Sequence, residues 1–77
     1  MNNARRKKVA KAYDMIQDLV ALLEEIRDEE QEAYANMPES LRDSEKGELM
    51  EDTVYRIESA IDDLDCVERD IEDVIQA

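Results

Sequence analysis

The sequence has no histidine, tryptophan or phenylalanine, and only one glycine, one proline and one cysteine in 77 residues. Without histidine, the chain has neither a serine-type catalytic triad nor a His-bearing zinc or di-iron site. One cysteine excludes an intrachain disulfide framework, and one glycine leaves no glycine-rich phosphate loop. We therefore expect a protein that is not an enzyme and that holds no cofactor and no metal.

Long apolar runs are absent as well. No uncharged run approaches the roughly 18 residues that a membrane span requires. The basic stretch from Arg5 to Lys8 is interrupted soon afterwards by Lys11 and Asp14, so it lacks the apolar region of a signal peptide. These features predict a cytoplasmic protein that does not enter a membrane.

What the sequence does contain is charge and helix-forming residues. The 22 acidic residues outnumber the 10 basic ones, for a net charge of −12. Low glycine and proline content favours helix, whereas high net charge with few aromatic residues favours disorder. The spacing of the apolar residues decides between these two alternatives.

Apolar residues recur at steps of three and four in two long segments, with one glutamate in each. The first series is Val9, Ala12, Ile16, Leu19, Leu23, Ile26, Glu30, Ala33 and Met37, and the second is Met50, Val54, Ile57, Ile61, Leu64, Glu68, Ile71 and Ile75. This spacing is typical of two amphipathic helices with a heptad-like seam. We expect Glu30 and Glu68 to lie near the ends of the helices, where each reaches water or a basic side chain, which for Glu68 would be Lys8 or Lys11. The alternative is that these two glutamates specify the register of the helices.

Pro38 separates the two series and disfavours helical geometry at the residue before it. The sequence therefore predicts one all-α domain over residues 1–77, an antiparallel two-helix hairpin of the coiled-coil type. Its first helix covers about 4–35, the turn 36–44 and the second helix about 45–76. Ser44 is the better N-cap of the second helix, and Ser40 could cap a single turn. The one glycine, Gly47, should weaken the first turn of that helix.

The charge distribution supports the hairpin. The basic residues Arg5, Arg6, Lys7, Lys8 and Lys11 would lie beside the acidic end of the second helix, where the two groups partly neutralise each other. With Val9 and Val54 as a positions of the heptads, the e positions on one flank of the seam are Tyr13, Val20, Arg27 and Tyr34 on the first helix and Glu51, Glu58, Asp65 and Glu72 on the second. Arg27 is placed there to meet one of these acidic residues. Exposed ion pairs are weak, so this argument concerns orientation and not stability.

The other flank, formed by the g positions, carries a second apolar strip. Two helices of this size bury too little apolar surface alone, and a stripe wider than a two-helix seam is typical of bundle helices. We therefore expect a homodimer that forms a four-helix bundle. The predicted dimer interface consists of Met15, Leu22, Ala60, Val67 and Val74.

Carboxylates are the only reactive groups in quantity. They could form a divalent cation site, but they lack the pattern and the turn glycine of a calcium loop, so a solvated helix face is the better interpretation. The predicted acidic partner-binding face consists of Glu24, Glu25, Asp28, Asp62, Asp63, Asp70 and Asp73. Cys66 is expected to be an exposed thiol at an outward position, and the three tyrosines are expected to pack at the helix edges.

One stretch resembles a known group of proteins. The residues from Arg27 to Tyr34, the turn Asn36-Met37-Pro38-Glu39, and Ser44-Glu45 are similar to those of small, uncharacterised phage and prophage proteins. The resemblance implies an acidic helical hairpin of mobile-element origin and transfers no site residues. Small acidic phage proteins often bind and inhibit host enzymes, so it also favours an inhibitor.

Two functional hypotheses follow. The first is an acidic interaction protein that docks on a basic surface of a host protein, as an inhibitor or a DNA mimic of a nucleic-acid or defence enzyme. Its acidic residues would recur about every 2.2 Å along a hairpin of about 48 Å, against about 1.7 Å per charge in duplex DNA. The second hypothesis is a self-assembling structural or adaptor helical module. Neither predicts direct binding of nucleic acid.

Overall fold

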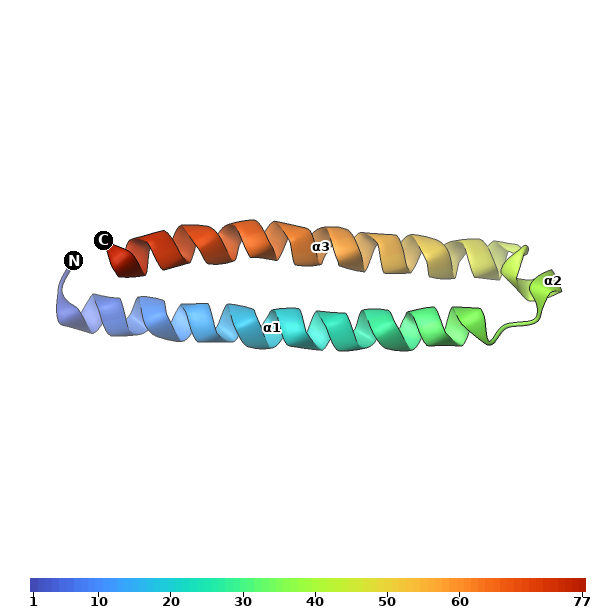
Figure 1. The fold of residues 1–77 in the computed structure, drawn as a ribbon, viewed down its shortest axis with the longest axis horizontal. Coiled ribbons are helices and arrows are strands. Elements are labelled where there is room, and N and C mark those ends of the chain that lie inside the picture. The colour runs from blue at the N-terminus through green and yellow to red at the C-terminus, as the bar shows by residue number, and fades with distance from the viewer.

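The structure, a computed structural model, describes residues 1–77 and is entirely helical apart from its turns. It contains two long helices, α1 (Asn3–Ala35) and α3 (Glu45–Gln76), and one short helix, α2 (Glu39–Arg42). The long helices lie side by side and antiparallel, so the two chain ends meet at one end and α2 lies at the other (Figure 1). The all-α prediction is confirmed, and the shape is a rod of 59 × 15 × 13 Å.

Local capping explains where α1 begins and ends. The side chain of Asn2 accepts a hydrogen bond of 2.8 Å from the backbone N–H of Arg5, so the helix begins one residue earlier than predicted. At the other end, the N–H of Asn36 donates to the carbonyl oxygen of Glu32 at 3.0 Å, and the N–H of Met37 donates to that of Tyr34 at 3.1 Å. Pro38 then adopts an extended conformation, with φ −56° and ψ 145°, and its ring fixes that φ.

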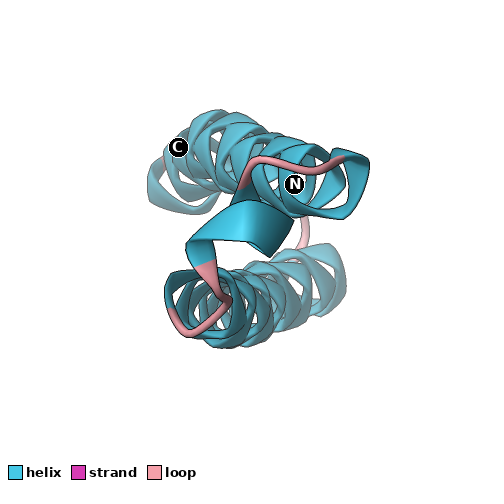
Figure 2. Cartoon of the chain, turned by 90° about the vertical axis from the view of Figure 1, so that its right-hand side faces the viewer, coloured by secondary structure: helices cyan, strands magenta, loops and turns pink.

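The turn contains one more helical element than the two-helix prediction allowed. Pro38 occupies the N-cap position of α2 and supplies no side-chain hydrogen bond, so Ser40 does not cap this turn as we expected. Figure 2 shows this single turn of helix lying across the end of the two long helices. Ser44 does occupy the N-cap position of α3, but its hydroxyl donates to the carbonyl of Leu41 and leaves the N–H groups of α3 uncapped. Ser44 therefore closes the turn instead of capping the helix.

Gly47 has a role that the sequence did not reveal. It is buried in the first turn of α3, where α2 packs against it. A Cβ atom at this position would lie 2.1 Å from the backbone carbonyl oxygen of Arg42. No side chain fits there, so the glycine allows α2 to pack closely on α3.

The hairpin alone has almost no interior. Only Gly47 and Ile61 are buried, and Ile61, at 8% exposure, is the single buried apolar side chain. The radius of gyration is 17.4 Å, whereas a globular domain of this length would have about 11.5 Å. The remaining seam residues are half-buried or exposed, so packing of α1 on α3 covers only one line of side chains.

Candidate functional site

The face of α1 that packs on α3 differs from the predicted seam. The e-position residues Tyr13, Val20 and Tyr34 are half-buried, although we placed them on a flank. Leu19 and Ile26, which belong to the predicted seam, are 43% and 40% exposed. Relative to the predicted seam, α1 is therefore rotated about its own axis, so that Leu19 and Ile26 face the g flank.

This rotation widens the apolar strip on the g flank. Met15 and Leu22 are 62% and 53% exposed on α1, and Val67 and Val74 are 43% and 40% exposed on α3. A shallow groove at the amino-terminal part of the strip is lined entirely by apolar side chains, those of Ala12, Met15, Ile16 and Leu19. We define the apolar strip as Met15, Leu19, Leu22, Ile26, Val67 and Val74.

Four of the five residues predicted for a dimer interface lie in this strip. The exception is Ala60, which is half-buried at the margin of the strip. Sequence reasoning missed Leu19 and Ile26, because their heptad positions assigned them to the contact between α1 and α3. The size of the flanking e residues Tyr13 and Tyr34 is the signal that could have indicated the rotation.

The e flank is where polar groups connect the two helices. The hydroxyl of Tyr34 donates a hydrogen bond to Oε1 of Glu51, and the amide of Gln31 donates one of 3.4 Å to Oε1 of Glu58. The bond to Glu51, followed by desolvation and the charge of that carboxylate, raises the pKa of Tyr34 above 10.0. These contacts define the antiparallel register near the turn.

Tyr13 has a similar environment near the open end of the hairpin. Its pKa is raised above 10.0, first by desolvation, then by the negative charges of Glu72 and Glu68 and by hydrogen bonding to Glu68. The seam residue Glu68 therefore lies near Tyr13, and it forms no ion pair with Lys8 or Lys11, which we expected as its partners. Glu68 and Glu30 are both half-buried.

Ion pairs form within helices and not between them. Arg27 pairs with the adjacent Asp28 at 3.1 Å, although we expected it to meet an acidic residue of the second helix. The other ion pair joins Arg56 and Asp52 at 2.7 Å, one turn apart in α3. The five basic residues at the amino end form no ion pair, although the hairpin brings the two chain ends together (Figure 1).

The seven residues of the predicted acidic face are all exposed, namely Glu24, Glu25, Asp28, Asp62, Asp63, Asp70 and Asp73. They occupy b, c and f positions, which point away from the neighbouring helix. Because the outward sides of two antiparallel helices face opposite directions, these carboxylates are spread around the rod instead of forming one patch. Any partner would therefore meet an acidic surface from several sides.

Other chemistry finds little support in the geometry. Cys66 is exposed, and the structure contains no group of three or more Asp, Glu, Cys or His side chains that could hold a metal ion. None of the helices combines the length and the apolar character that crossing a membrane would require. The surface thus offers two features for recognition, the apolar strip and the carboxylates.

Comparisons with known protein families, with curated proteins and with solved structures found no match to this chain.

Proposed function

We propose that this chain is a non-enzymatic, acidic interaction protein of the phage type that acts in the cytoplasm by docking on a basic surface of a host protein. One observation carries the proposal. Of the 22 acidic side chains, only Asp28 and Asp52 form ion pairs within the chain. Most of the others are exposed and make no ion pair, so they can pair with basic residues of a partner, and such complementarity favours fast and specific association.

Inhibition of a nucleic-acid or defence enzyme by DNA mimicry is the specific form of this proposal. The 22 carboxylates are distributed over a rod of 59 Å, one for about every 2.7 Å. This spacing is wider than the 2.2 Å expected from the helix length alone, because the turn lengthens the rod. It is also wider than the value of about 1.7 Å for duplex DNA. A single hairpin therefore supports docking on a basic surface better than it supports mimicry.

The docking proposal can be tested by capture from a bacterial lysate at low and at high salt. We expect a basic host protein to bind at low salt and to elute as salt rises, because exposed charges are screened. Neutralising the seven carboxylates of the predicted acidic face to Asn or Gln should abolish this capture. A matched variant neutralises seven other carboxylates, Asp14, Asp18, Glu29, Glu32, Glu39, Asp43 and Glu45.

The two seven-residue variants have the same net charge, so they separate binding through the seven predicted positions from binding by general acidity. Loss of capture only in the first variant supports the predicted face, whereas equal loss in both supports binding by overall charge. No salt-sensitive partner, or capture that is unchanged in the first variant, would contradict docking through this face.

A second candidate function has its own observation in favour. The apolar strip is a feature of self-assembling and adaptor helices, which pack on another helix through such a surface. We propose under this candidate that the hairpin dimerises into a four-helix bundle. Salt separates the two candidates, since apolar packing does not weaken as ionic strength rises.

A further inference from the structure

We infer that the apolar strip is occupied by a second copy of this chain, which packs its own strip against it along the g flanks of α1 and α3. The inference rests on the self-assembly candidate above and adds Leu19 and Ile26 to the interface. It is independent of whether the acidic surface binds a host protein.

The single hairpin lacks an interior of its own. A lone hairpin with one buried apolar side chain, Ile61, has too little core for a stable 77-residue fold. Chains of this size usually require a metal, disulfides or oligomerisation. The single cysteine excludes an intrachain disulfide, and no acidic or thiol cluster could hold a metal ion. Of these three, oligomerisation remains, and a second copy would bury the apolar surface that the single hairpin leaves exposed.

The size of the face also bears on its occupant. The face that carries the strip measures about 59 by 15 Å, or roughly 900 Å² per copy if it is covered along its whole length. A standard stable interface buries about 800 Å² per partner. The strip itself spans only residues 15–26 of α1 and 67–74 of α3, so two hairpins reach the size of a specific interface only if they are in contact along the whole rod.

Charge restricts how two copies can meet, because each chain carries −12. The g positions of the two helices contain a single acidic residue, whereas the e positions of α3 alone contain four. The g positions are Lys8, Met15, Leu22, Glu29, Asn36, Lys46, Thr53, Ala60, Val67 and Val74, and the acidic e positions are Glu51, Glu58, Asp65 and Glu72. The g flank is the side on which two copies meet with the least repulsion.

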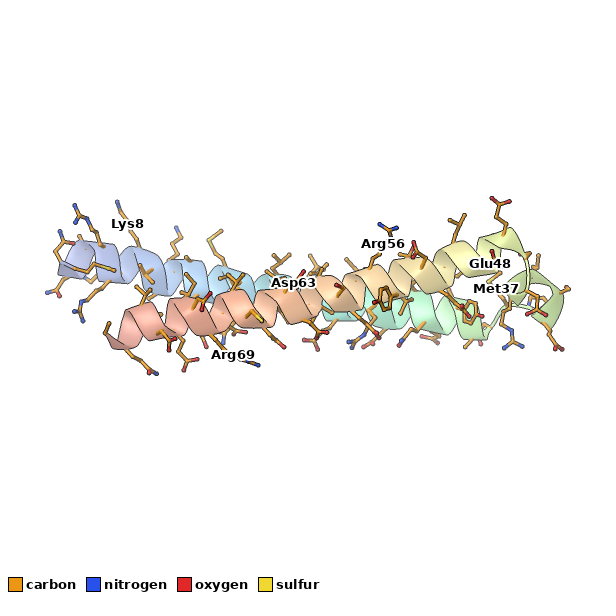
Figure 3. All side chains as sticks on the ribbon, turned by 90° about the horizontal axis from the view of Figure 1, so that it is seen from above. Lys8, Met37, Glu48, Arg56, Asp63 and Arg69 are labelled. Carbon is orange, nitrogen blue, oxygen red and sulfur yellow. The ribbon has the colours of Figure 1, made fainter.

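Two labelled basic side chains agree with this choice. Lys8 and Arg56 point to the same side of the rod, whereas Arg69 points to the opposite side (Figure 3). By heptad position, Lys8 lies at a g position and Arg56 at the adjacent c position, one beyond each end of the strip, whereas Arg69 lies at a b position beside the e flank. Arg56 is paired with Asp52, so Lys8 is the one of these two that adds a positive charge without an ion pair beside the strip.

The test is sedimentation of the whole chain over a range of concentrations, at moderate salt. We expect the native chain to sediment at twice its mass of 9.0 kDa at micromolar concentration. Leu22→Glu should shift it to the monomer, because the charge would be buried without a partner. The matched control is Tyr55→Glu, because Tyr55 is 71% exposed and lies at a b position, beside the e flank and away from the strip.

A helical dimer for the control and a monomer for Leu22→Glu would support the inference. If Leu22→Glu unfolds, the native chain still decides the question. A folded, monomeric native chain at high micromolar concentration would overturn it and leave the strip for a helix of a different protein. Equal dissociation by both substitutions would overturn the strip as the interface.

The outcome is distinguishable from that of the docking proposal. A native monomer that captures a basic protein refutes the dimer and retains docking, whereas a dimer without such a partner does the reverse. If both hold, two fully overlapping copies would present 44 carboxylates over 59 Å, one for about every 1.3 Å. This spacing is shorter than the value of about 1.7 Å per charge in duplex DNA, so the dimer would have a higher charge density than DNA. Dimerisation would therefore supply the charge density that mimicry needs.

Discussion

The hydroxyl of Tyr34, in the last turn of α1, donates a hydrogen bond to Oε1 of Glu51, two turns into α3. This contact joins the two helices next to the turn, on the flank opposite the apolar strip. It requires the protonated phenol, since a phenolate beside a carboxylate would repel it. The bond to Glu51 accordingly raises the pKa of Tyr34 above its ordinary value of 10.0.

Stability should therefore fall at alkaline pH in a way that depends on Tyr34. Because the pKa of Tyr34 is raised in the folded state, its contribution is fully present below pH 10.0 and is lost as pH rises through the folded value. We expect the stability difference between the native chain and Tyr34→Phe to shrink as pH increases above 10.0. Denaturant titrations at several pH values measure this difference, and a constant difference would show that the hydrogen bond contributes nothing.

Substitution of Gly47 should be destabilising, although alanine is the better helix former. Glycine costs about 1 kcal/mol relative to alanine within a helix, so propensity alone predicts that Gly47→Ala stabilises the chain. The clash with the backbone of Arg42 opposes this gain, and overpacking of this kind costs about 1–3 kcal/mol. We expect a net loss of stability in chemical denaturation and faster amide exchange in α2.

Lys46→Ala is the control for this substitution, because Lys46 is adjacent and exposed. It introduces alanine into the same turn without a clash and should leave stability and exchange nearly unchanged. A rise in stability for Gly47→Ala would show that α2 moves away easily and that the close approach is incidental.

Gly47 also illustrates what the sequence could and could not predict. Apolar periodicity and Pro38 placed the two long helices and the turn, because these signals are local. The role of Gly47 depends on α2 folding back onto α3, a contact between segments that no local pattern specifies. Sequence reasoning therefore assigned this glycine only a helix-weakening effect.

The rotation of α1 escaped prediction for a related reason. Its apolar arc extends from Tyr13 through Ile16 to Met15 and Leu19, which is wider than one neighbouring helix can cover. Heptad labels identify the arc but not the half that α3 covers. In the structure the larger e-position side chains take that place, and Leu19 and Ile26 remain for the strip.

Mutations along the seam should differ with burial. Ile61→Ala removes the only buried apolar side chain and should cost about 2–5 kcal/mol. Leu23→Ala should cost less, because Leu23 is only half-buried. Asp63→Ala and Asp28→Ala, at exposed positions, should change stability by less than about 0.5 kcal/mol.

Thermal melts followed by circular dichroism measure these four changes. Equal effects of Ile61→Ala and Asp63→Ala would contradict the assignment of Ile61 to the contact between α1 and α3. A cost for Leu23→Ala as large as that for Ile61→Ala would indicate that Leu23 is more deeply buried in solution than in a single hairpin.

Salt should act on the two proposed interactions with opposite signs. Each chain carries −12, so two copies repel each other and added salt screens that repulsion. Docking on a basic partner is attractive, and the same screening weakens it. We therefore expect the dimer to tighten and the host complex to dissociate as ionic strength rises. Sedimentation of the native chain and the lysate capture, run at matched salt concentrations, measure the two trends. A dimer that dissociates with salt would show that ion pairs hold the copies together, so Leu22 and Val67 would not form the main contact.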